Sequence, residues 1–285
     1  MRTIKKPVAI LLCVLMLSLS LSVLAFAEET LHYVVLGDSI AKGTGLMNED
    51  EACYGRIVAD TCGYSYANYG VDGHTTDDLL GRLSEENVRN DVIKADIISI
   101  SIGGNDYRHS GMISLLFDAL VKKDYAKVDR IAEKYYNNLC RIMGVINELN
   151  ADAVVLMQTM YNPQMGTIRP AYQQAADRIN AAIARYDSEN PDDIVIVDVG
   201  SALGADSKNY AGDAMHPSAR GNEIIAKLIV DTLYSLNLTD KTELQINTEG
   251  KTNVLYPARA VEILGVMFTA LGKIYDIFAK VKNMF

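Results

Sequence analysis

Residues 31–39, LHYVVLGDS, and residues 97–106, IISISIGGND, decide the fold class of this chain. Each is a short apolar run that ends in glycine followed by polar residues, which is typical of a β-strand leading into a turn. Similar runs occupy residues 64–69, 153–158 and 194–199. Most of them show no alternation of apolar and polar residues, as expected for strands that are buried on both faces. The five runs therefore predict a parallel sheet.

Stretches with helical character separate the apolar runs, at residues 54–62, 76–83, 112–149, 171–188 and 218–236. Strands that alternate with helices predict βαβ crossovers and a single α/β domain, which we place at residues 28–238. The polar segment 239–257 predicts a linker. Residues 258–285 predict an amphipathic helix, because apolar residues recur there at three- and four-residue spacing: Val261, Leu264, Phe268, Leu271, Ile274, Phe278 and Val281.

The first 27 residues have the features of a secretory signal peptide. Arg2, Lys5 and Lys6 precede an apolar run, and Ala25-Phe26-Ala27 supplies a cleavage pattern of small residues. We expect cleavage after Ala27 and a secreted or extracytoplasmic protein that could stay associated with the cell surface. An uncleaved anchor helix is the alternative, since the apolar run approaches the length that spans a bilayer.

Composition excludes several classes of protein. The chain has 285 residues, of which 49% are hydrophobic, and a formal net charge of −9. The acidic balance argues against nucleic acid as a partner, because proteins that bind it present a basic face.

Cys53 and Cys62 lie at the two ends of a predicted helix. Its nine residues rise roughly 13.5 Å, which is too far for a disulfide between them. We expect the cysteines to be free.

Polar clusters follow four of the apolar runs or lie close to their ends, at residues 37–39, 68–74, 103–106 and 213–217. Ligands of open parallel sheets bind beyond the carboxyl ends of the strands, so these clusters are expected at one edge. Ser39 is the candidate nucleophile, since it follows a strand directly and stands where a helix N-terminus would favour negative charge. A helix cap is the alternative role for this serine.

His216 is the candidate general base. Asp213 precedes it by three residues in a loop, where its carboxylate could fix the tautomer of the ring and leave the other nitrogen facing Ser39. A serine that attacks an acyl carbon also needs donors for the oxyanion. The backbone N–H groups of Ser39 and Gly73 and the side-chain amide of Asn105 could supply them. A helix cap at residues 213–217 and a tight turn at residues 103–106 are the structural alternatives.

Together these clusters resemble the SGNH hydrolase family of GDSL-type esterases and lipases, in particular its secreted bacterial lipase-like branch. The resemblance covers residues 31–236 and rests on Gly37-Asp38-Ser39, Gly73, Gly104-Asn105-Asp106 and Asp213-x-x-His216. It implies a flavodoxin-like, three-layer α/β/α sandwich with a five-stranded parallel sheet. It also implies Ser39 as nucleophile, His216 as base, Asp213 as its orienter, and Gly73 and Asn105 as oxyanion donors. Nearby residues that could contact substrate are Asp38, His74, Asp106 and Tyr161.

The implied reaction is hydrolysis of a carboxylic ester through an acyl-enzyme, and it needs no cofactor or metal. The substrate stays open between a lipid or lysophospholipid ester, an acetylated cell-wall or plant polysaccharide, and a small thioester. A non-catalytic secreted binding protein on the same scaffold is the alternative from another class. Residues 112–149 are expected to wall the acyl pocket, with Ile113, Leu115 and Phe117 as the side chains that set chain-length preference.

The C-terminal segment 258–285 has a formal charge of +2, whereas residues 28–257 sum to −14. Two interpretations of this segment stay open. It could contact a membrane surface peripherally, or it could pack on its own domain or on a second copy of the chain.

Overall fold

Five parallel strands form one sheet in the order β2-β1-β3-β4-β5. The computed structural model describes residues 30–248, 250–253 and 259–282, so the predicted signal peptide at residues 1–27 lies outside the described residues. The strands span His32–Gly37 (β1), Ser65–Gly70 (β2), Ile97–Ser101 (β3), Val154–Gln158 (β4) and Val195–Val197 (β5). The prediction of a five-stranded parallel sheet is confirmed.

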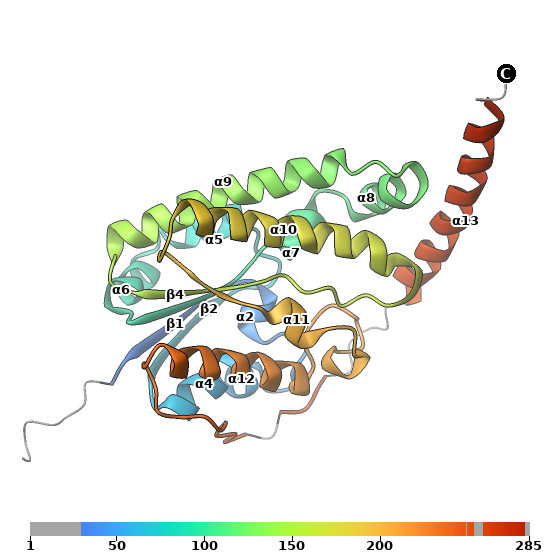
Figure 1. The fold of residues 1–285 in the computed structure, drawn as a ribbon. Helices are drawn as coiled ribbons and strands as arrows, with labels where there is room; N and C mark the ends of the chain where they lie inside the picture. The colour runs from blue at the N-terminus through green and yellow to red at the C-terminus, as the bar shows by residue number, and fades with distance from the viewer. Residues whose placement is uncertain (1–29, 249, 254–258, 283–285) are drawn as a thin grey trace, which may run out of the picture. The chain divides into compact units, whose positions relative to one another are not determined.

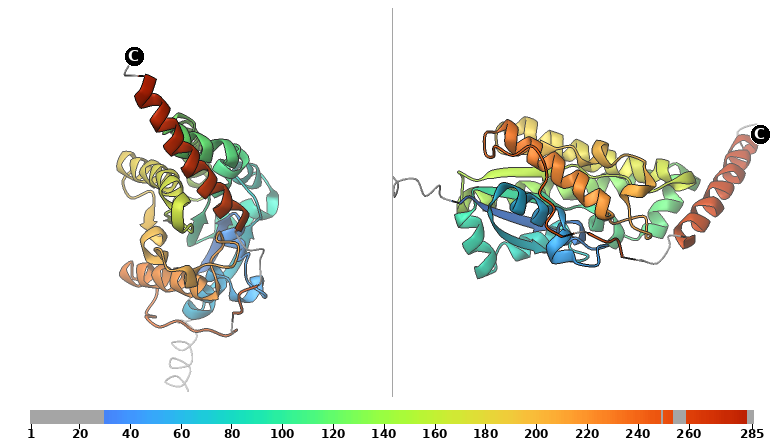
Figure 2. Two further views of the ribbon diagram at one scale, coloured as in Figure 1. Left: turned by 90° about the vertical axis from the view of Figure 1, so that its right-hand side faces the viewer. Right: turned by 90° about the horizontal axis from the view of Figure 1, so that it is seen from below.

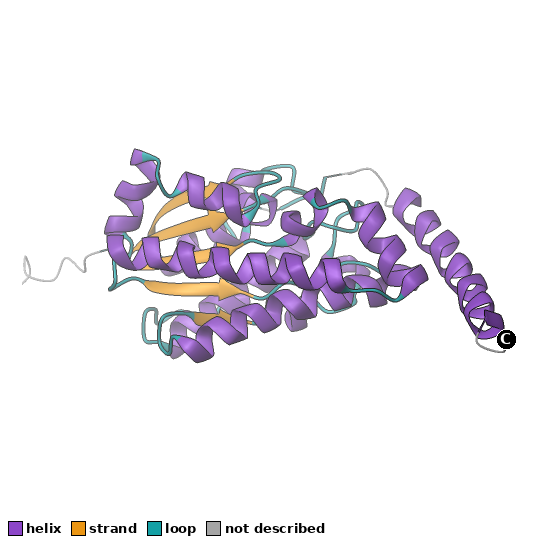
Figure 3. Ribbon diagram, turned by 90° about the horizontal axis from the view of Figure 1, so that it is seen from above, coloured by secondary structure: helices purple, strands orange, loops and turns teal. Residues whose placement is uncertain are grey.

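Helices cover both faces of the sheet, which confirms the three-layer arrangement (Figures 1 and 2). Alternate residues of β1 belong to different hydrophobic clusters, because successive side chains of a strand point to opposite faces. Val34 and Leu36 pack in the cluster that includes α5 (Thr76–Arg82), α6 (Glu86–Lys94), α9 (Ala126–Leu149) and α10 (Arg169–Glu189). Tyr33 and Val35 pack in the cluster that includes α4 (Tyr54–Cys62) and α12 (Ala219–Ser235). Figure 3 shows two long helices lying along one face of the sheet.

The predicted helix at residues 112–149 is interrupted. It consists of α8 (Met112–Phe117), a π-helical turn η1 (Asp118–Lys122) and α9. Lys123 has a φ of 57°, a left-handed conformation that ends the turn. The Asp124 carboxylate then accepts a hydrogen bond from the backbone N–H of Ala126, and so helps to start α9. A run of apolar residues alone does not reveal this break.

The remaining helices are short, except for the last: α2 (Ser39–Lys42), α3 (Glu49–Ala52), α7 (Gly104–His109), η2 (Gly166–Ile168), α11 (Val199–Leu203), η3 (Ser207–Asn209) and α13 (Arg259–Lys282). Strand β5 is three residues shorter than expected, because the Asp198 side chain accepts a hydrogen bond from the N–H of Ser201 and caps α11. No strong apolar pattern marks α6, whose buried residues are Val88 and Val92.

The predicted linker follows the surface of the domain in its described part. The N–H of Met47 donates to the carbonyl of Lys251 at 2.9 Å, and the N–H of Asn253 donates to the carbonyl of Gly45 at 2.7 Å. Residues 251–253 are therefore held beside the loop that follows α2.

Cys53, Cys62 and Cys140 are free cysteines. Among the described helices, none combines the length and apolar character needed to cross a bilayer.

Candidate active site

The Gly37-Asp38-Ser39 turn brings Ser39 to the edge of the sheet at the end of β1. Gly37 has a φ of 143°, and a Cβ at this position would lie 2.0 Å from the carbonyl oxygen of Ser101. Only glycine allows β1 and β3 to approach this closely at the turn. Asp38 then caps α2 by accepting a hydrogen bond from the N–H of Ile40 at 2.9 Å. Ser39 is the first residue of that helix.

The side chains of Ser39, His216 and Asp213 form a continuous hydrogen-bonded row. Nε2 of His216 lies 2.9 Å from Oγ of Ser39, and Nδ1 of His216 lies 2.5 Å from Oδ2 of Asp213. With the ring proton on Nδ1, His216 donates to the carboxylate and its Nε2 accepts from the serine hydroxyl. A hydroxyl, an imidazole and a carboxylate in this order can generate an alkoxide nucleophile.

The loop carrying Asp213 is shaped to keep its carboxylate beneath the ring. Oδ1 of Asp213 accepts hydrogen bonds from the backbone N–H groups of Met215 and His216. Burial by itself would raise the pKa of the Asp213 carboxyl, but the hydrogen bond and charge of His216 outweigh it and hold the pKa below its usual value. Asp213 therefore stays ionised at neutral pH, as an orienting carboxylate must.

Tyr161 also binds the loop that carries Asp213 and His216. Its hydroxyl donates to the carbonyl of Met215 at 2.8 Å, and both residues line the cavity beside Ser39. The expected contact of Tyr161 with substrate is thus available to its ring, whereas its hydroxyl is occupied in holding the loop that carries His216.

The two further candidate oxyanion donors are Asn105 and Gly73, of which Asn105 is among the residues that line the cavity. Asn105 lies in the first turn of α7 and lines the cavity together with Ser39. Its Nδ2 donates one hydrogen to the carbonyl of His74 at 3.0 Å. The second amide hydrogen has no acceptor among the described residues, so it is available to an oxyanion. Gly73 has a φ of 79°, which allows a tight turn just before His74.

Asp106 and His74, which are expected to contact substrate, are not among the residues that line this cavity. The Asp106 carboxylate instead accepts hydrogen bonds from the N–H of Thr76 at 3.1 Å and from its hydroxyl at 2.5 Å. Burial raises the pKa of Asp106, while the bonds from Thr76 act in the opposite direction. The carbonyl of His74 serves Asn105. Through these hydrogen bonds, Asp106 and His74 hold Thr76 and Asn105 in place.

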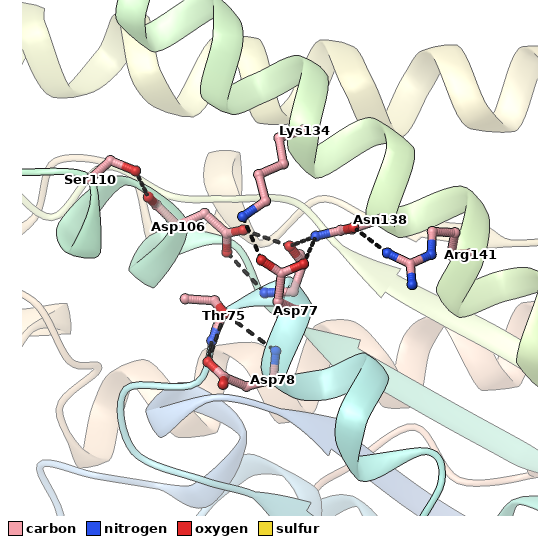
Figure 4. A network of polar contacts seen from close by, with 9 residues as sticks. Thr75, Asp77, Asp78, Asp106, Ser110, Lys134, Asn138 and Arg141 are labelled. Carbon is pink, nitrogen blue, oxygen red and sulfur yellow. Dashed lines mark hydrogen bonds and ion pairs between the residues drawn. The ribbon is translucent and has the colours of Figure 1, made fainter.

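A wider network joins Asp106 to α9 (Figure 4). Asn138 donates to the Thr76 hydroxyl at 2.8 Å and to Asp77 at 2.9 Å, and Lys134 pairs with Asp77 at 2.5 Å. These contacts tie the start of α5 to α7 and α9. Sequence reasoning missed Thr76 and Asn138. The sequence does contain a signal for Asn138, because this asparagine stands at an otherwise apolar position of α9. Asn138 is buried at that position.

Asp38 is buried and lines the same cavity as Ser39. Burial raises the pKa of Asp38 to about 7, which the hydrogen bond from Ile40 and the charge of His216 offset only in part. This carboxyl therefore titrates near neutral pH inside the site.

An apolar cavity of about 1110 Å³, including its open mouth, adjoins Ser39. Much of its wall comes from α8, η1, α9 and α10, as the side chains of Met112, Leu115, Leu116, Ala119, Val128, Ala171, Tyr172 and Ala175. Leu115 thus occupies the wall as expected. Ile113 is instead exposed, and the ring of Phe117 packs edge-on against Phe268 with centroids 5.7 Å apart. The phase of α8 explains the difference, because it turns Leu115 and Leu116 inward.

No metal-binding group of three or more His, Cys, Asp or Glu side chains occurs within residues 30–248, 250–253 and the described part of α13.

Several known proteins resemble this chain in sequence or in fold. Residues 35–224 match the GDSL-like lipase/acylhydrolase family. The chain is 25% identical to the protein YpmR of Bacillus subtilis over 222 residues, which cover 72% of this chain and 82% of that one. It is 24% identical to the spore germination lipase LipC of Bacillus licheniformis over 207 residues, 70% and 94% of the two chains. The crystal structure of the lipase Lip_vut3 from a goat rumen metagenome has a similar fold, with a TM-score of 0.61, 24% identity and coverage of 72% and 98%.

Proposed function

Since the chain belongs to the GDSL-like lipase/acylhydrolase family, we propose that it is a serine ester hydrolase that uses Ser39, His216 and Asp213 as its catalytic triad. One observation carries the proposal. The Ser39 hydroxyl lies 2.9 Å from Nε2 of a histidine whose Nδ1 contacts a carboxylate, and Ser39 lines an apolar cavity.

The reaction follows from these positions. Oγ of Ser39 bonds to the carbonyl carbon of the ester while its proton passes to Nε2 of His216, whose positive charge Asp213 stabilises. The oxyanion accepts hydrogen bonds from the free Nδ2 hydrogen of Asn105 and from the N–H groups of Ser39 and Gly73. The tetrahedral intermediate collapses, the bond to the alcohol breaks, and His216 returns the proton to the leaving oxygen.

Deacylation repeats these steps with water. A water molecule gives its proton to His216 as its oxygen bonds to the acyl carbon. The bond to Oγ of Ser39 breaks and Oγ recovers the proton, so that the carboxylic acid leaves and the resting state is restored.

A lipid ester is the substrate class that the cavity supports best. Its walls are largely apolar, which suits a fatty acyl chain better than an acetyl group on a polar glycan. Arg108 also lines the cavity and forms no ion pair with a described residue, so its guanidinium is available to a phosphate of the alcohol part. A lysophospholipid combines both features. With the signal peptide expected at residues 1–27, we propose that the enzyme acts outside the cytoplasm.

Hydrolysis of p-nitrophenyl esters from acetyl to palmitoyl tests the proposal. We expect activity that rises beyond the acetyl ester and is lost in Ser39→Ala, with unchanged thermal unfolding of the variant. Activity confined to the acetyl ester would favour a carbohydrate O-acetyl esterase. Hydrolysis that does not depend on Ser39, or no hydrolysis of any ester, would contradict the proposed function and favour a binding protein.

A further inference from the structure

Helix α13 turns an apolar face away from the domain. Residues of an α-helix follow one another at about 100° around its axis. Gly265, Phe268 and Gly272 therefore share one side, and this side packs on the domain. A Cβ on Gly265 would meet Ile168 at 1.9 Å, and one on Gly272 would meet the carbonyl of Leu120 at 2.4 Å. Such close packing through two glycines fixes which side of the helix faces inward.

The opposite side of α13 is formed by apolar residues, which we call the docking face: Ile263, Met267, Ile274, Ile277, Phe278 and Val281. Their exposed fractions run from 45% to 70%, although each is a large hydrophobic side chain. The charged side chains of Glu262, Lys273 and Lys280 lie along one flank of the helix. This pattern is typical of a helix that lies in the interface of a lipid bilayer.

Only the inner side of α13 separates the docking face from the residues that line the cavity. Phe268, on the inner side of α13, packs against the cluster that contains Leu116, Ala119 and Ala171. These three residues also line the cavity beside Ser39. The contacts of α13 with α8, η1 and η2 hold the helix at this end of the domain (Figures 1 and 2). A surface bound by the docking face would therefore lie close to the acyl-chain cavity.

Charge favours an anionic lipid surface as the occupant. The segment Arg259–Lys282 carries four basic and two acidic residues, a charge of +2, in a chain whose formal net charge is −9. An anionic surface attracts this segment and repels most of the remaining protein, which orients the molecule with α13 toward the lipid. A dimer through paired docking faces would instead bring together two segments of the same positive charge.

We propose that the docking face binds an anionic lipid surface and positions the cavity to receive an acyl chain from it. This inference rests on the proposed function for the identity of the substrate. Binding itself needs no catalysis, so it can be measured without hydrolysis.

The test uses the mature full chain carrying Ser39→Ala and vesicles of equal parts phosphatidylcholine and phosphatidylglycerol. We expect the protein to sediment with these vesicles, and less with vesicles of phosphatidylcholine alone. The double variant Ile274→Glu with Phe278→Glu replaces two side chains that lipid would bury in the bound state. Each replacement is expected to weaken vesicle binding by about tenfold or more. The matched control is Ile93→Glu on α6, because Ile93 and Ile274 are both 49% exposed.

Circular dichroism and the thermal midpoint check that each variant is folded. Vesicle binding that the double variant loses and Ile93→Glu retains supports the proposal. Equal binding by folded double and control variants would overturn it. So would a lack of vesicle binding together with a dimer, seen by sedimentation, that the double variant abolishes, because the face would then cover a second copy. Vesicle binding without Ser39-dependent ester hydrolysis in the parent chain would leave docking intact and contradict the proposed function alone.

Discussion

Replacing Asp38 by asparagine should make the protein more stable at neutral and alkaline pH. Asp38 is 4% exposed and accepts a hydrogen bond from the N–H of Ile40. Asparagine has nearly the same shape and caps a helix as well as aspartate, so the cap is retained. The variant removes only the need to ionise a carboxyl inside the protein.

The sign and size follow from the pKa of Asp38. Burial raises its pKa from 3.8 to about 7 in the folded protein. At low pH the carboxyl is protonated in both the folded and the unfolded chain, so its ionisation does not change the free energy of unfolding there. As the pH rises from about 4 through 7, the unfolded chain loses this proton first, and folding becomes less favourable. At 1.36 kcal/mol per pKa unit, the loss of stability reaches about 4 kcal/mol above pH 7.

Urea unfolding of the parent chain and of Asp38→Asn, at about pH 4, 6 and 8, measures this effect. The free energy of unfolding of the variant should exceed that of the parent by an amount that grows between pH 4 and pH 8. A constant difference across this range would refute the assignment of a raised pKa to Asp38. A difference that shrinks with increasing pH would mean that ionised Asp38 stabilises the fold.

Four further changes probe the turn, the cavity and the site. Gly37→Ala should destabilise the fold by about 3 kcal/mol or more, measured by urea unfolding, because its Cβ would overlap a backbone oxygen at 2.0 Å. Ala119→Phe should shift the preferred p-nitrophenyl ester to shorter acyl chains, since it fills the cavity. Asp213→Asn should lower kcat by roughly 10³–10⁴ while the protein stays folded, since the ring loses its orienting carboxylate. Thr76→Val should lower stability by about 1–3 kcal/mol by leaving Asp106 with an unmet hydrogen bond, and should reduce kcat more than it raises KM.

The sequence was sufficient to predict a five-stranded parallel sheet and the edge at which polar clusters gather. The signal is local, because an apolar run followed by glycine and polar residues predicts both a buried strand and the point where the strand ends. Ser39 and Asn105 each follow such a strand, and the structure places them at the same cavity. His216 instead lies in a loop, and Asp213 three residues before it was the signal that marked it as a candidate.

Other features depend on packing that sequence periodicity does not reveal. The amphipathic pattern of α13 was predicted, but the side that faces the domain was not. That side is set by Gly265 and Gly272, which permit a closer approach than the larger apolar residues do. The hydrogen bonds of Asp106 and His74 were also not predicted. Asp106 accepts a hydrogen bond from Thr76, and the carbonyl of His74 accepts one from Asn105. Each bond joins residues about 30 positions apart in the chain.

Labelling with a fluorophosphonate probe tests most directly whether Ser39 is an activated nucleophile. The probe should add to one peptide of the mature chain, with the adduct on Ser39, as mass spectrometry of a digest would show. His216→Ala should slow this labelling by several orders of magnitude, because the hydroxyl loses the base 2.9 Å away. An adduct on another residue, or labelling that is equally fast without His216, would contradict the account.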